Sequence, residues 1–177
     1  MTIIYIPIHL RDLGMSWGDI GLVLTVMLVP FVLLQYPVGL LADKFFGERR
    51  MLIHSILLLG VSTVCMAFVS IPSVGLWMIV LLFSRIGAAF VEILRDSYFY
   101  KQIDGRDVNV IYLFRTARPM GYIVAALLSG ALLAIFPREV LFFVLGLVVF
   151  SGFIPAFLLP ATSLRKGGFF RLSRDIV

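Results

Sequence analysis

The chain has 177 residues, of which 61% are hydrophobic and 14% are charged, and its mean hydropathy is +1.07. A soluble domain is about 45–50% apolar and about 25% charged, and a core of this size cannot bury so much apolar surface. The composition therefore excludes a soluble enzyme or nucleic-acid-binding protein, and we assign the formal charge of +5 to loops that orient helices in a lipid bilayer.

The chain opens with an apolar stretch, residues 1–9, that is too short to cross a bilayer, which takes about 20 residues of helix. We expect it to be the outer end of a truncated sixth helix, with a signal-anchor or an interfacial strap as the alternative. It lacks the basic start and cleavage site of a secretory signal. An extracellular turn should follow, with Ser16 as the N-cap of the next helix and Asp19 at its third position.

Five later segments are long and apolar enough to span a bilayer, and they predict an all-α, polytopic membrane helix bundle. Pro30 and Pro37 should kink the first span rather than end it. The predicted half-domain covers residues 1–160, and a basic tail covers 161–177. The spans lie at about 21–42, 51–70, 74–94, 110–136 (most apolar from Pro119) and 140–160.

The connections between these spans alternate between basic and non-basic, which predicts their sides. Three basic residues follow the first span, and basic residues also follow the third and the fifth. By the positive-inside rule these segments are cytoplasmic, so the C-terminus is cytoplasmic and the N-terminus lies outside. We expect a multi-pass integral protein of the cell (inner) membrane.

The first cytoplasmic connection, in PVGLLADKFFGERRML, gathers charges directly after a glycine-containing apolar run. It resembles the loop signature of the major facilitator superfamily: Gly39, Asp43 and Lys44 fall in register. Phe45 and Phe46 stand where the pattern has one residue, so Gly47 comes one place late. A second, shortened resemblance is FSRIGAAFVE, which is similar to the pattern of the family's fourth helix. Together the two cover one six-helix half without most of its first helix.

The resemblance implies a secondary transporter in which two six-helix halves rock around a central site. In that scheme the loop acts as a cytoplasmic gate, and we expect Gly39 to let two helices approach closely. The alternative is that its charges are only solvated loop charges, which we weigh equally for Lys44, Arg49 and Arg50. The predicted gating residues are Gly39, Asp43, Lys44, Gly47, Arg49 and Arg50.

Arg85 lies near the middle of the third span, where a charge is costly and should face protein or a water-filled cavity. Glu92 follows seven residues later on the same helical stripe, with the small Ala89 between them. One hypothesis is that both residues line the transport path, binding an anionic group or relaying a proton. The other is an internal ion-pair network, which we favour for Glu92 but not for Arg85.

Four further charges lie close enough to the cytoplasmic side to join such a network. Arg115 and Arg118 open the fourth span and could pair with Glu92, Asp96 or Asp43, or could extend to the membrane interface. The predicted ion-pair partners are Arg95, Asp96, Arg115 and Arg118.

The chain ends soon after its fifth span with a short basic tail, which favours the C-terminal half of such a transporter. We expect it to need the missing half or an oligomeric partner, with an unknown small solute as substrate and proton coupling permitted. A complete five-span scaffolding protein is the alternative. Arg85→Gln separates the two hypotheses: a permease should lose transport and remain folded, whereas a scaffold should lose assembly or stability.

No nucleotide-binding loop, zinc-protease motif or serine elbow occurs in the sequence. Two histidines and one cysteine do not make an ordinary metal site. We therefore expect no enzyme activity, no metal and no cofactor.

Overall fold

The computed structural model describes residues 2–41, 47–103 and 108–159, and every regular element in these ranges is an α-helix. Five of the helices, or helix pairs, are long and apolar enough to cross a membrane. The predicted all-α polytopic bundle is therefore confirmed. The helices are α1 (Thr2–Asp12), α2 (Trp17–Leu41), α3 (Glu48–Phe68), α4 (Val74–Gln102), α5 (Val108–Leu133), α6 (Arg138–Ser151) and α7 (Phe153–Leu158).

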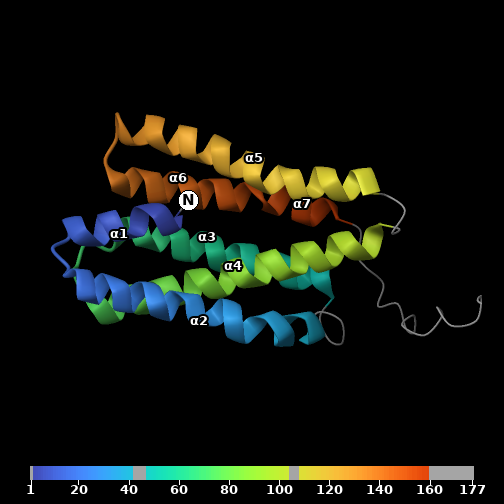
Figure 1. The fold of residues 1–177 in the computed structure, drawn as a ribbon, viewed down its shortest axis with the longest axis horizontal. Helices are drawn as coiled ribbons and strands as arrows, with labels where there is room; N and C mark the ends of the chain where they lie inside the picture. The colour runs from blue at the N-terminus through green and yellow to red at the C-terminus, as the bar shows by residue number, and fades with distance from the viewer. Residues whose placement is uncertain (1, 42–46, 104–107, 160–177) are drawn as a thin grey trace, which may run out of the picture.

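The long helices lie side by side, with α3 and α4 in the middle of the bundle (Figure 1). Helix α4 packs against α2 and α3, and α3 also packs against α6. The connections 13–16, 69–73 and 134–137 lie at one end, which we call the turn end (Figure 1). The start of α3 and the end of α4 lie at the other end, which we call the charged end because it carries Glu48, Arg49 and Lys101.

Helix α1 extends three residues beyond the predicted stretch, to Asp12, before the chain turns into α2. It ends in a hydrogen-bonded reversal: the amide of Gly14 donates to the carbonyl of Arg11, and that of Met15 donates to Leu10. Gly14 has φ 90°, which glycine adopts without a Cβ penalty. The predicted cap is confirmed, since the Asp19 amide donates to the Ser16 hydroxyl at 3.1 Å.

Helix α2 is continuous from Trp17 to Leu41, so Pro30 and Pro37 lie inside it and do not end it, as expected. The fifth span behaves differently, because α6 ends at Ser151 and α7 begins at Phe153. Pro155 has no N–H to donate to the carbonyl of Ser151, and its ring crowds that carbonyl. The single helix expected over 140–160 is therefore broken at Gly152.

Helix α4 extends well beyond its predicted span at the charged end of the bundle, whereas α5 begins within two residues of its predicted start. Helix α4 continues to Gln102, whereas the sequence predicted a span ending at residue 94, and α5 begins at Val108. Leu94 and Tyr98 are both buried and lie one turn apart, so the extra turns keep one apolar face against the bundle. The connection predicted after residue 94 is thus largely helical.

The buried apolar side chains form two clusters along α4. Trp77 and Leu81 belong to a cluster at the turn end, together with Ile6 and Leu10 of α1. Leu94 belongs to the second cluster, at the charged end, with Leu52 and Ile56 of α3 among its members. Arg85 lies on α4 between these clusters, which fix the helix on both sides of it.

The crossing of α3 and α4 depends on Gly87. A Cβ added at Gly87 would lie 2.8 Å from the backbone nitrogen of Leu59, closer than such atoms approach in proteins. Gly87→Ala should therefore lower the free energy of unfolding in detergent micelles by about 1–3 kcal/mol, because the two backbones must separate. Gly75→Ala, on the same helix with nothing within 4 Å, is the control and should not lower it. Equal losses in both variants would contradict this close contact.

Helix α5 packs differently from the rest of the bundle. Ser129 is its one buried residue, and its principal helix–helix packing is against α6. Arg115 and Thr116 are exposed within this candidate span. Exposed apolar side chains can face lipid, but exposed polar ones at membrane depth need protein or water.

Candidate functional site

Arg85 is held by α4 in the middle of the bundle, and only 7% of it is exposed. Among the residues that the structure describes, its guanidinium makes no ion pair, and its Nε atom has no hydrogen-bond partner. A buried charge is ordinarily paired or hydrogen-bonded, because desolvation costs free energy. Neither an ion pair nor a hydrogen bond within the described residues therefore accounts for the burial of Arg85.

Arg85 lines a cavity of about 460 Å³ between four helices. Helix α3 contributes Leu59 and Thr63, α4 contributes the stretch from Ser84 to Arg95, and α5 and α6 form the opposite walls. The α5 wall includes three small residues, Ala117, Gly121 and Ala125, beside Arg118 and Tyr122. A volume of this size is in the range of small-molecule sites, and small residues on α5 leave that space open.

Glu92 lines the same cavity and pairs with Arg118 of α5, with 2.6 Å between Oε1 and Nη2. The Nε of Arg118 donates to the Tyr122 hydroxyl at 3.3 Å, so the tyrosine proton stays available to another acceptor. The structure thus brings Arg85, Glu92 and Arg118 together around one cavity, the first two from α4 and the third from α5. The charge of Glu92 is already matched, whereas that of Arg85 is not.

Two of the other predicted ion-pair partners lie next to this cavity, and one stands apart. Arg95 pairs with its neighbour Asp96 at 2.7 Å, and its guanidinium lies over the ring of Phe114. That ring stacks on Phe99, which ties α5 to α4. Arg115 is exposed and makes no ion pair with any residue that the structure describes.

Once the neighbouring carboxylate of Asp96 is counted with the residues of the cavity wall, one cation remains unmatched. Three arginines and one glutamate line it: Arg85, Arg95, Arg118 and Glu92. Arg118 is matched by Glu92 and Arg95 by Asp96, which leaves Arg85 alone. The site can therefore accept one negative charge without displacing an existing ion pair.

The predicted gating loop is described only in part. Asp43 and Lys44 lie outside the described residues. A Cβ built at Gly39 would meet nothing within 4 Å, so the close helix approach expected there is not seen in the described part of the chain. Gly47 has φ 74° and precedes α3, a conformation that favours glycine. Arg50 is exposed.

Arg49 and Glu48 connect the start of α3 to other helices. The Nη2 of Arg49 donates to the carbonyl of Phe157 in α7 at 2.6 Å. Glu48 is only 3% exposed, and its Oε1 lies 2.6 Å from Lys101 Nζ and accepts a hydrogen bond from Ser97 at 2.7 Å. Glu48 was not among the residues predicted for this site.

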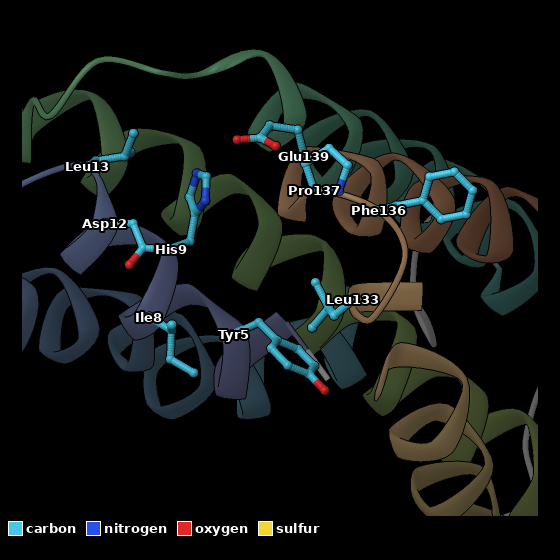
Figure 2. A pocket seen from close by; sticks show the side chains of 9 residues that line it. All are labelled: Tyr5, Ile8, His9, Asp12, Leu13, Leu133, Phe136, Pro137 and Glu139. Carbon is cyan, nitrogen blue, oxygen red and sulfur yellow. The ribbon is translucent and has the colours of Figure 1, made fainter. Parts of the chain in front are cut away.

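A second cavity, of about 590 Å³, lies at the turn end between α1 and the α5–α6 connection (Figure 2). His9 and Asp12 of α1 and Glu139 of α6 are among its lining residues (Figure 2). The His9 ring is 4% exposed and makes edge contacts with Trp77 and Phe142. These ring contacts hold α1 against α4 and α6, and they account for His9 as a packing residue.

Among the described residues, no three His, Cys, Asp or Glu side chains gather as metal ligands would. A comparison with curated proteins found no match. A protein-family model with the description Major Facilitator Superfamily matches residues 1–171, which is nearly the whole chain.

Proposed function

Because the chain belongs to the major facilitator superfamily, we propose that it forms one half of a secondary transporter that moves a small solute by alternating access. Members of this superfamily are transporters rather than enzymes, which fits the absence of catalytic motifs from the sequence. The observation that carries the proposal is the buried guanidinium of Arg85 on the wall of a cavity of small-molecule size. A charge inside a membrane bundle ordinarily serves substrate or ion movement.

In this proposal Arg85 and Glu92 lie in the substrate or proton pathway. The Glu92–Arg118 pair joins α4 to α5 across the cavity, so its breakage would let α5 move relative to the rest of the bundle. The segment from Gly39 to Arg50 serves as the gate at the charged end. We place that end in the cytoplasm, because basic connections are retained on the cytoplasmic side.

The exposed side of α5 supports the second part of the proposal, that further helices complete the cavity. These helices belong either to the same polypeptide or to a partner subunit. Arg115 and Thr116 would then contact protein or water rather than lipid. Tyr112 and Leu113, which are 65% and 73% exposed, would pack in the same interface.

The test is sided thiol labelling, which needs no known substrate. Ala125→Cys places a thiol on the cavity wall, in a Cys65→Ala background that removes the exposed native thiol. Alternating access predicts that a membrane-impermeant maleimide labels this thiol in both right-side-out and inside-out vesicles.

Leu127→Cys is the matched control, because Leu127 lies two residues away on α5, is 71% exposed and does not line the cavity. Its thiol should remain unlabelled from either side. Labelling of Ala125→Cys from one side only, or from neither, would contradict alternating access and favour the scaffolding function.

A further inference from the structure

The cavity around Arg85 presents hydrogen-bond donors without matching acceptors. The Arg85 guanidinium has no partner among the described residues, and its Nε atom is buried. The Tyr122 hydroxyl accepts from Arg118 and keeps its own proton to donate. The one carboxylate on the wall, Glu92, is held by Arg118. An acceptor must therefore come from outside the described chain.

The rest of the cavity wall is mostly apolar. Leu59 and Val91 line it from α3 and α4, and Leu145 and Val148 line it from α6. An inorganic anion would leave this apolar surface facing water, whereas an organic anion would cover it. A second negative group on the ligand would meet the carboxylate of Glu92. Charge, donors and apolar wall together favour a ligand with one anionic group and an apolar body.

We propose that the cavity binds an organic monocarboxylate, with its carboxylate on Arg85 and its apolar body against α5 and α6. This inference rests on the proposed function and names the substrate class of that site. A planar guanidinium matches a carboxylate through two parallel hydrogen bonds, which lysine cannot reproduce. The hydroxyl proton of Tyr122 is a further donor on the same cavity.

The experiment measures binding of sodium benzoate to the full chain, purified in its native assembly in an uncharged detergent, by titration calorimetry. We expect saturable binding of benzoate and no saturable binding of benzamide, its neutral analogue, or of inorganic phosphate. Arg85→Gln should weaken benzoate binding at least about thirtyfold, because a buried charge partner is lost. Arg11→Gln, an exposed arginine of α1 outside the cavity, should leave the affinity unchanged.

Arg85→Lys keeps the charge but loses the two parallel hydrogen bonds of the planar guanidinium. It should therefore bind benzoate more weakly than the wild type and more tightly than Arg85→Gln. Thermal unfolding of each variant confirms that the protein measured is folded. Benzoate binding that is equal in Arg85→Gln and the wild type would overturn the proposal. Absence of saturable binding by a folded wild type, or equal binding of phosphate or benzamide, would also overturn it.

This result is separable from the proposed function, because the binding assay does not depend on transport. Arg85-dependent benzoate binding with thiol labelling from one side only would support the binding site and refute alternating access. Labelling from both sides without benzoate binding would support alternating access and refute the proposed binding site.

Discussion

Replacing Arg85 with methionine is expected to raise the free energy of unfolding, by up to about 2.5–3.5 kcal/mol, which is the cost of an arginine at the centre of a membrane helix. Arg85 is 7% exposed, and no ion pair with a described residue offsets its desolvation. Methionine is long, flexible and apolar, so it can fill the same space. The measurement is equilibrium unfolding in detergent micelles without added ligand.

Arg50→Met is the control, because this arginine is exposed at the start of α3 and should change the unfolding free energy by less than about 0.5 kcal/mol. A residue kept for function at a cost in stability gives this pattern, since functional sites commonly oppose stability. A large loss of stability in Arg85→Met would show instead that the arginine orders the bundle. It would favour the ion-pair network that the sequence left open for this residue.

Replacing Lys101 with methionine should have the opposite effect, a loss of about 1–3 kcal/mol in the free energy of unfolding, less than for a fully buried pair because Lys101 is 45% exposed. The carboxylate of Glu48 is 3% exposed and would keep the hydrogen bond from Ser97 after its cation is removed. A buried charge without its partner is strongly destabilising, because it has lost water without compensation. The same unfolding assay measures this loss.

Two variants test whether the loss of stability comes from the buried carboxylate of Glu48, which Lys101→Met leaves without a cation. The double variant Glu48→Gln/Lys101→Met removes both charges and should recover most of the loss. Arg118→Met leaves Glu92 unpaired, but Glu92 is 34% exposed, so water replaces the cation and the loss should stay within about 1 kcal/mol. Equal losses for Lys101→Met and Arg118→Met would contradict the burial of Glu48.

The helix content and the positions of the spans could be predicted because a bilayer imposes length and apolarity on every crossing segment. The N-cap at Ser16 could also be predicted, since it depends on residues within one turn. The break at Gly152 was missed, although Pro155 lies three residues beyond it. Prolines in α2 leave that helix continuous, so the presence of proline did not by itself predict a break.

The candidate site could be predicted only where one helix carries it. Arg85 and Glu92 share a stripe of α4, and the seven-residue spacing is enough to place them on one face. The pairing of Glu92 with Arg118 was one of several open alternatives, because it depends on where α5 lies. The Glu48–Lys101 pair was missed because the end of α4 was expected to be a connection, and a loop residue has no fixed position opposite α3.

The central claim is that this chain supplies one half of a transport cavity that further helices complete. The most direct measurement is the protein mass of the native complex that contains the chain, extracted in mild detergent and measured by light scattering with the detergent contribution removed. The account predicts a protein mass of at least twice 19.8 kDa, from a longer polypeptide or from a partner subunit. A single chain of 19.8 kDa as the whole complex would contradict it.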